Sequence, residues 1–406
     1  MSMRRLRADK DGGARPGILA AYRPDARFMP SRRDLLRLAA LAGTGALLPA
    51  CGASGYDEAV AATWRHAPAV PSEPLPLQRE LVRYATLAAN SHNTQPWRFA
   101  LDGSTIVIQP DLARRTPAVD PDDHHLWVSL GCAAENLVLA AAAFGRRAEI
   151  EFDARTNLLR VFLEPMAPVR SPLFEAIPRR QCTRAEYDGQ PLPPAELRAL
   201  GSTASGRGVQ ALLLVDRSRI DAVTDFVIQG NTAQMREAAF VRELMQWIRF
   251  GEREALEARD GLFARSSGNP AVPRWLGSMM FRWFFTEKAE NDRYARQMRS
   301  SSGVMVFIGR SARPAHWVEV GRAYQRFALL ATSLGIRNAF VNQPVEVPAL
   351  REQFAQWLGM EEARPDLVVR FGRGPLMPPS LRRPIDAVIG GPRALQARRD
   401  TKAGAA

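Results

Sequence analysis

Apolar residues recur with two periods along this chain, and together they predict a protein built from both helices and strands. Short apolar runs bounded by turn residues are typical of strands. They cover 97–101, 105–109, 148–152, 158–163, 209–215, 304–308 and 367–371. Asp102 and Gly103 separate the first two runs and predict a hairpin with a type I′ turn. Because helical and strand segments alternate irregularly and hairpins recur, we expect an α+β fold with a mixed sheet rather than a doubly wound fold.

Two longer, mostly apolar segments match each other without a gap. Trp127–Gly145 and Trp317–Gly335 share Trp, Val, Gly, Ala and Leu at corresponding positions. Each predicts a largely buried helix that ends at a glycine, because left-handed dihedrals just after a helix suit glycine best. An ordinary Ala/Leu-rich core helix would share part of this pattern. The matched end points favour an internal duplication, with 165–172 as the linker between the two halves.

The stretch 89–99, A-N-S-H-N-T-Q-P-W-R-F, carries the densest group of candidate binding residues. It follows a helix-patterned run and precedes the first predicted hairpin. Small polar side chains and two amides stand beside Trp97, so the turn offers several hydrogen bonds next to a flat apolar wall. A planar ring edged with heteroatoms, such as a flavin, needs that combination. The candidate residues are Asn90, Ser91, His92, Asn93 and Gln95.

Charge and cysteine content narrow the function classes. The formal net charge of +13 raises the question of nucleic-acid binding. The first 50 residues hold ten basic and four acidic side chains, and the remaining arginines lack interleaved aromatics, so nucleic acid is not expected as a partner. Three cysteines are too few for a disulfide framework, and no metal-type spacing is present. Adjacent His124 and His125 should point apart on a helix, so no metal site is expected.

The N-terminal region, 1–50, resembles an export signal. Ser31-Arg32-Arg33 forms a twin-arginine pattern before the apolar run Leu38–Ala50, whose 13 residues fall short of the roughly 20 that span a bilayer. The alternative is a fortuitous arginine pair ahead of an ordinary helix. Either Met1 or Met29 could be the start. We expect export by the Tat translocase to the periplasm or to the outer face of the cytoplasmic membrane.

Cys51 follows Leu48-Pro49-Ala50 and resembles the lipidated residue of a lipobox. Proline at the middle position is unusual, so the sequence leaves acylation open. A lipid anchor at Cys51 would tether the protein without a transmembrane helix.

The turn at 90–97 resembles the S-x-x-N-x-Q-P-W turn of the nitroreductase family, which lies against the isoalloxazine ring of FMN. Ile177–Pro193 resembles the family's R-R-S-x-R motif, whose arginines and serine hold the FMN phosphate and pyrimidine edge. Arg180, Cys182 and Arg184 fall on the first Arg, the Ser and the last Arg. Cysteine is a departure, because a thiol is a weaker hydrogen-bond partner than a hydroxyl.

Two further segments carry the same resemblance. Arg370–Pro384 is similar to the family's closing segment, in which Arg382 and Arg383 match a basic pair that reaches the phosphate. Asn338–Arg351 is similar to the P-x-E-G loop, whose backbone N–H approaches flavin N5. Glu346 and Val347 occupy the Glu and Gly places of that loop.

The two halves have kept different parts of this pattern. The first half has the turn but no arginine motif, and the second has the arginine motif but a degenerate counterpart of the turn at 202–210. In dimers of the family, the turn of one subunit meets the arginines of the other. The resemblance therefore implies one polypeptide that mimics a dimer, a monomer with a single FMN. It is closest to the tandem, Tat-exported branch of Acg-type flavoproteins.

The resemblance implies that the chain has five parts. A linker (51–74) follows the signal region (1–50), the first nitroreductase-like half covers 75–165, and the second covers 172–390. A flexible tail (391–406) follows. The stretch 242–302, rich in Trp, Phe, Arg and Met, is interpreted as extra helices or as a lid over the flavin.

The resemblance implies a flavin oxidoreductase that passes hydride or two electrons from a donor such as NAD(P)H, or a quinol, to a quinone or nitroaromatic acceptor. No catalytic side chain is required, and His92 is the one candidate proton donor. The alternative is a non-catalytic FMN-storage protein. A structural cell-envelope lipoprotein is a weaker third reading.

Overall fold

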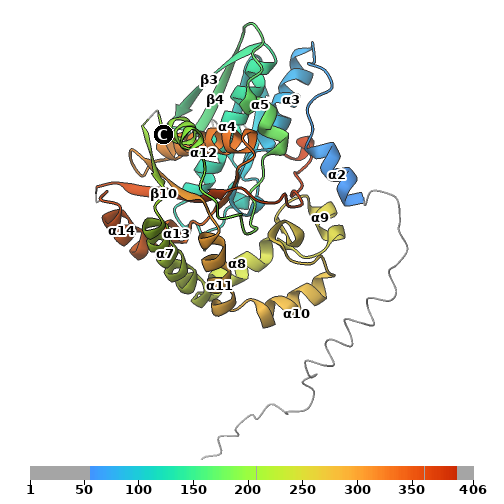
Figure 1. Cartoon of the computed structure of the whole chain (residues 1–406). Coiled ribbons are helices and arrows are strands. Elements are labelled where there is room, and N and C mark those ends of the chain that lie inside the picture. The colour runs from blue at the N-terminus through green and yellow to red at the C-terminus, as the bar shows by residue number, and fades with distance from the viewer. Residues whose placement is uncertain (1–54, 207, 361, 391–406) are drawn as a thin grey trace, which may run out of the picture. The chain divides into compact units, whose positions relative to one another are not determined.

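The computed structural model describes residues 55–206, 208–360 and 362–390, which belong to one compact unit, Ala53–Ala406. Figure 1 shows the elements in their order along the chain. The predicted signal region 1–50, Cys51 and the tail 391–406 lie outside the described residues.

A four-stranded sheet forms most of the first half. Strands β1 (Trp97–Asp102), β2 (Thr105–Pro110), β3 (Arg146–Asp153) and β4 (Leu158–Pro165) stand in the order β1-β2-β4-β3. The hairpin predicted at 97–109 is present, and the predicted strands at 148–152 and 158–163 pair as a second hairpin; both are antiparallel. The β1–β2 turn differs from the expectation. Since Asp102 pairs with Thr105, the loop residues are Gly103 and Ser104, and of these Gly103 alone has a positive φ, which indicates a type II′ turn.

The second half holds a separate four-stranded sheet. It consists of β5 (Val209–Leu214), β8 (Gly303–Gly309), β9 (Arg337–Phe340) and β10 (Arg364–Gly372), in the order β5-β8-β10-β9. The predicted mixed sheet is wrong, because neighbouring strands in both four-stranded sheets pair antiparallel. Strand β8 is buried along its whole length, which explains why its sequence reads as a continuous apolar run.

Helices α4 (His124–Ala143) and α12 (Pro314–Ser333) pack against each other, and they contain the two matched segments. A Cβ built on Gly131 would lie 2.0 Å from the carbonyl oxygen of Val318, and one on Gly321 would lie 2.0 Å from that of Val128. The approach is reciprocal, as expected when two copies of one helix meet. By length and composition α4 could span a membrane, but 83% of that stretch is buried inside the protein, so it is a core helix.

Polar side-chain contacts also join α4 and α12. Arg322 Nε donates to Glu135 Oε2 at 2.9 Å, and Gln325 Nε2 donates to Asn136 Oδ1 at 2.8 Å. Both helices end as predicted, with Gly145 at φ 72° and Gly335 at φ 73°.

The remaining helices cover these layers. In the 51–74 linker and the first half they are α2 (Gly55–Thr63) and α3 (Pro74–Thr86). In the second half they are α5 (Pro172–Ala176), α6 (Pro194–Ala204), α7 (Arg217–Arg236), α13 (Gln343–Glu346) and α14 (Pro348–Trp357).

The stretch 242–302 forms its own group of short elements, drawn in yellow and light orange in Figure 1. They are α8 (Ala238–Trp247), β6 (Ile248–Arg249), α9 (Glu252–Ala258), β7 (Leu262–Phe263), α10 (Arg274–Phe284) and α11 (Glu287–Arg299). Helix α2 packs on α9 through a small core that includes Tyr56, Ala255 and Phe263. The start of the described chain is therefore fixed to this group.

Candidate functional site

A cavity of about 390 Å³ is lined by both halves and by the 242–302 group. The first half contributes Asn90, Ser91 and His92, and the second contributes Arg184 and Glu346. The 242–302 group adds an aromatic wall, of which Phe281 and Phe285 stack with ring centroids 4.2 Å apart, and Tyr294 is a further member. Pockets of roughly 300–1,000 Å³ that combine apolar walls with a few polar groups are typical of small-molecule sites.

The turn on the cavity wall has an unusual backbone. His92, Asn93 and Gln95 have φ values of 45°, 53° and 54°, in the left-handed region that non-glycine residues rarely occupy. Such strain persists only where the surroundings fix the conformation, and it is concentrated at functional sites. Inside the turn, Gln95 N donates to Asn90 Oδ1 at 2.9 Å.

The two predicted amides fix this turn by contacts with the second half. Asn93 Nδ2 donates to the carbonyl of Gly261 at 3.0 Å, and Asn93 Oδ1 accepts from Arg382 Nη1 at 2.8 Å. Gln95 Oε1 accepts from the backbone N–H of Arg383 at 2.8 Å. Both amides lie outside the cavity lining. The structure therefore joins the turn to the C-terminal arginines and leaves Asn90, Ser91 and His92 on the cavity wall.

Arg180 and Arg382 lie close to each other but outside the cavity lining. Both are buried, and both guanidinium groups lie over the ring of Trp64, at 5.9 and 4.8 Å from its centroid. Arg382 donates to the carbonyls of Thr86 and Ala88, and Arg180 donates to that of Leu87. Among the described residues neither arginine has a carboxylate partner, and Arg180 Nε has no hydrogen bond.

Of the remaining predicted residues, some line the cavity and others do not. The side chain of Arg184 lines the cavity and makes no hydrogen bond or ion pair with any described residue. Cys182, Val347 and Arg383 do not line it. Cys182 forms an isolated parallel bridge with Asn338 at the edge of β9. The N–H of Val347 donates back to the carbonyl of Gln343 at 3.4 Å, closing the short helix α13.

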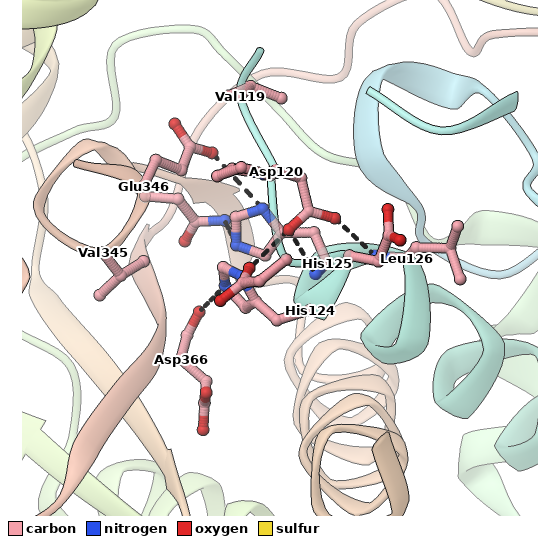
Figure 2. A network of polar contacts seen from close by, with 12 residues as sticks. Val119, Asp120, His124, His125, Leu126, Val345, Glu346 and Asp366 are labelled. Carbon is pink, nitrogen blue, oxygen red and sulfur yellow. Dashed lines mark hydrogen bonds and ion pairs between the residues drawn. The ribbon is translucent and has the colours of Figure 1, made fainter. Parts of the chain in front are cut away.

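A buried polar network adjoins the cavity at the start of α4 (Figure 2). Asp120 accepts from the backbone N–H groups of His125 and Leu126, at 3.1 and 3.0 Å. His124 Nδ1 lies 3.0 Å from both Asp120 and Asp122. The rings of His124 and His125 have centroids 3.8 Å apart, so the expectation that they point apart is wrong. Both histidines lie in the first turn of α4. Asp120 contacts the ring of His124 and accepts a hydrogen bond from the backbone N–H of His125.

This triad has the composition of a metal site, since ligand atoms of Asp120, His124 and His125 lie within 4.8 Å of one another. Hydrogen bonding already accounts for its geometry, because Asp120 caps the helix and His124 bridges two carboxylates. Burial alone would lower the pKa of His124, but its hydrogen bonds to Asp120 and Asp122 raise that pKa to about 9. The site therefore holds a positive charge on His124 at neutral pH.

The charge on His124 affects the groups nearer the cavity. Burial, reinforced by charged His124, lowers the pKa of His125 to about 3, so its ring is neutral. His125 Nδ1 lies 3.7 Å from Glu346 Oε1. Figure 2 draws this contact as a dashed line. Burial raises the pKa of Glu346 to about 7, despite the hydrogen bond that its Oε2 accepts from Gln234 Nε2 at 2.7 Å. At neutral pH Glu346 is therefore part protonated and faces the cavity.

His92 was predicted as the candidate proton donor, but its surroundings favour the neutral ring. Burial, reinforced by the charge of Arg184, lowers the pKa of His92 to about 4, so the ring is neutral at pH 7. Its buried Nδ1 has no hydrogen-bond partner within the described chain, and the same holds for Gln343 Oε1 in the cavity wall. His92 can still offer or accept one hydrogen bond, but it does not carry a proton to release near pH 7.

No family model matches the chain. It is similar to two proteins of Mycobacterium tuberculosis (strain ATCC 25618 / H37Rv). It is 24% identical over 330 residues to "Putative NAD(P)H nitroreductase Rv3131", covering 78% of this chain and 92% of that protein. It is also 24% identical over 325 residues to "Putative NAD(P)H nitroreductase acg", covering 77% and 94%. The chain is nitroreductase-like. Among solved structures, it matches a nitroreductase with bound FMN from Bacteroides fragilis with a TM-score of 0.31 and 15% identity, over 51% of this chain and 90% of that one.

In this nitroreductase-like chain, Glu346 is the ionisable group best placed in the cavity to act as an acid. The sequence did not identify it as an acid. Glu346 was predicted only as the neighbour of a backbone N–H, and Asp120 and His125 were not predicted as site residues at all. A signal was present in D-P-D-D-H-H, 120–125, just before an apolar helix. Such a run predicts a capped helix start. The run does not reveal that His125, at this helix start, contacts Asn342 and Glu346 of the second half.

Proposed function

We propose that this chain is an FMN-dependent oxidoreductase that passes hydride or two electrons from a reduced nicotinamide to a quinone- or nitroaromatic-type acceptor, using one composite site. The names of its relatives support an NAD(P)H-linked reductase. The observation that carries the proposal is the cavity between the halves, whose wall holds three polar groups without a partner among the described residues. These are His92 Nδ1, Gln343 Oε1 and the guanidinium of Arg184.

The residues present fit a flavin ring. Buried nitrogen and oxygen atoms are almost always hydrogen-bonded, so unpaired ones in a cavity wall indicate a bound partner with donors and acceptors of its own. The cavity also has a flat apolar side, formed by Phe281 and Phe285. A flavin offers both a heteroatom edge and two broad faces. A bound FMN would therefore satisfy groups that are otherwise costly to bury.

The arginine pair fits an anion such as the FMN phosphate. Arg180 and Arg382 are neighbouring buried cations that pair with no carboxylate in the described part of the chain, an arrangement that needs a counter-charge. Stacking on Trp64 and bonds to carbonyls compensate part of that cost. Arg180 Nε has no hydrogen-bond partner within residues 55–206, 208–360 and 362–390, so it is available to a phosphate oxygen. We therefore keep Arg180 and Arg382 as the proposed phosphate ligands.

When bound, the flavin supplies the hydride chemistry, and the protein supplies position, charge and protons. Arg184 places a fixed positive charge in the cavity, which stabilises negative charge that develops there. Glu346 holds a proton at its carboxyl and can donate it to an acceptor oxygen, because its pKa is about 7. Neutral His125 and the amide of Gln234 hold that carboxyl in place.

The test has two steps. Purified protein should show a flavin absorption spectrum, and NADH or NADPH should then be oxidised in steady state when menadione or a nitroarene is added. Glu346→Gln should lower kcat, with a smaller effect on KM, and should remove the activity loss above about pH 7. A colourless protein that does not take up added FMN would refute the proposal.

FMN storage is the second candidate function. The aromatic residues of the 242–302 group line much of the cavity, and a wall of this kind would restrict a nicotinamide from reaching the ring. Bound flavin that neither nicotinamide nor a quinol reduces, but that dithionite does reduce, would favour storage.

Export and oligomeric state are parts of the same proposal. The twin-arginine pattern at 31–33 supports Tat-dependent export, and the reciprocal α4–α12 contact supports a monomer that mimics a dimer. Arg32→Lys/Arg33→Lys should keep the protein in the cytoplasm on cell fractionation. Sedimentation equilibrium should give the mass of one chain.

A further inference from the structure

Helix α10 has two apolar faces, although it lies at the surface. Its inner face, with Gly277, Met280 and Phe281, lines the cavity. Its outer face carries Trp275 and Trp283, which are 71% and 57% exposed. A helix that is apolar on both sides is normally buried on both sides. The described residues cover only the inner side.

The outer face has the composition of a helix that lies in a membrane interface. Trp275, Met279, Arg282 and Trp283 follow i, i+4, i+7 and i+8 spacing and therefore share one side of α10. Tryptophan and arginine together are typical of helices at the headgroup level, because the indole needs both an apolar and a polar environment. With 11 residues, α10 is too short to cross a bilayer, which takes about 20.

The charges around this face suit an anionic surface. Arg282 is exposed and forms no ion pair with a described residue, so its charge is free to meet a headgroup. Arg274 pairs with Glu254, and Glu287 pairs with Arg236, so these two acids are already neutralised. A cation near an anionic bilayer contributes about 1 kcal/mol to binding.

The chain's own connectivity points to the same side. Helix α2 starts at Gly55, whose Cβ position lies 3.9 Å from Leu256 in α9, and α9 belongs to the group that contains α10 (Figure 1). Cys51 is four residues before Gly55, a reach of at most about 14 Å for extended chain. A lipid anchor at Cys51, if it is formed, would hold the α9–α10 group close to the membrane.

We propose that α10 docks this protein onto an anionic lipid bilayer, with Trp275 and Trp283 inserted at the headgroup level and Arg282 on a lipid phosphate. Phe284 lines the cavity and is 62% exposed, so the mouth of the cavity lies beside the docked helix. The proposal does not depend on which cofactor or substrate the cavity binds.

The experiment uses the full chain carrying Cys51→Ser, so that no acyl group contributes. The probes are phosphatidylglycerol and phosphatidylcholine vesicles with brominated acyl chains, which quench tryptophan on contact. Every tryptophan of the chain lies at or beyond Trp64, so the quenching does not report on the apolar leader. We expect quenching with phosphatidylglycerol vesicles, and at least a ten-fold weaker titration for Trp275→Gln/Trp283→Gln.

Two further variants test the charge of Arg282 and the effect of exposed apolar side chains elsewhere on the surface. Arg282→Gln should weaken binding to phosphatidylglycerol about five-fold and leave phosphatidylcholine binding unchanged. Leu75→Gln/Val169→Gln removes two other exposed apolar side chains and should titrate as the parent does. Thermal melting by circular dichroism checks that each variant is folded.

Three outcomes would overturn the proposal. They are a parent protein that shows no quenching, a Trp275→Gln/Trp283→Gln variant that is quenched as strongly as the parent, and a lipid-free dimer in sedimentation velocity that this variant abolishes. The last result would assign the outer face of α10 to a second copy of the chain.

Discussion

Replacing Glu346 by glutamine removes a titrating carboxyl from the cavity wall and keeps its shape and its contact with Gln234. Burial raises the pKa of Glu346 from 4.5 to about 7. The protonated form is therefore favoured in the folded state, and folding stability falls as pH rises from the unfolded pKa to the folded one. At about 1.36 kcal/mol per pKa unit, ionising this group in place costs about 3 kcal/mol of stability.

Glutamine does not ionise, so Glu346→Gln should be more stable than the parent at alkaline pH and nearly equal to it in acid. We expect the difference to grow by about 2.5 kcal/mol between pH 5 and pH 8. Urea unfolding monitored by tryptophan fluorescence at a series of pH values measures it. The parent curve also contains His124, whose pKa of about 9 removes stability as pH rises above 6.5. This contribution is present in both proteins, and only the coupling between the charges of His124 and Glu346 remains in the difference.

Glu352→Gln is the matched control, because Glu352 is an exposed carboxyl on α14. Its replacement should change the free energy of unfolding little, because the side chain is solvent-exposed. A Glu346→Gln difference that does not change with pH would refute the reasoning, because it would show that Glu346 ionises as easily in the folded protein as in the unfolded chain.

Three further predictions concern the cofactor and the core. Arg184→Ala should weaken FMN binding by about 1.5–3 kcal/mol, measured by quenching of flavin fluorescence, whereas Arg184→Lys should recover part of it. Arg180→Ala with Arg382→Ala should strip the flavin during purification, and stoichiometric FMN in that variant would disprove the phosphate assignment. Gly321→Ala should lower the free energy of unfolding by about 3 kcal/mol, at the upper end for overpacking, because the new Cβ meets the carbonyl of Val128; an unchanged urea midpoint would contradict this.

Local patterns were sufficient for most of the helices and strands, including the two matched helices, whereas the duplication stays a prediction. The predicted hairpins, the second-half strands and the two matched helices all occur, because period and turn residues act over a few neighbouring positions. Gly145 and Gly335 end their helices in left-handed conformation for the same local reason. The type I′ turn and the mixed sheet were wrong, since register and strand direction depend on partners elsewhere in the chain.

The sequence by itself determined the α+β class, the strands and the two matched core helices, and it predicted a polar turn suited to a planar ring. Tertiary structure decided which side chains face the cavity. Asn93 and Gln95 are held by the second half, whereas Arg184 and Glu346 reach the cavity from it. It also made Glu346 an acid with a pKa near 7 and placed the rings of His124 and His125 against each other. The physical reason is that side-chain direction and desolvation arise from contacts between distant segments, and these contacts leave no periodic trace in the sequence.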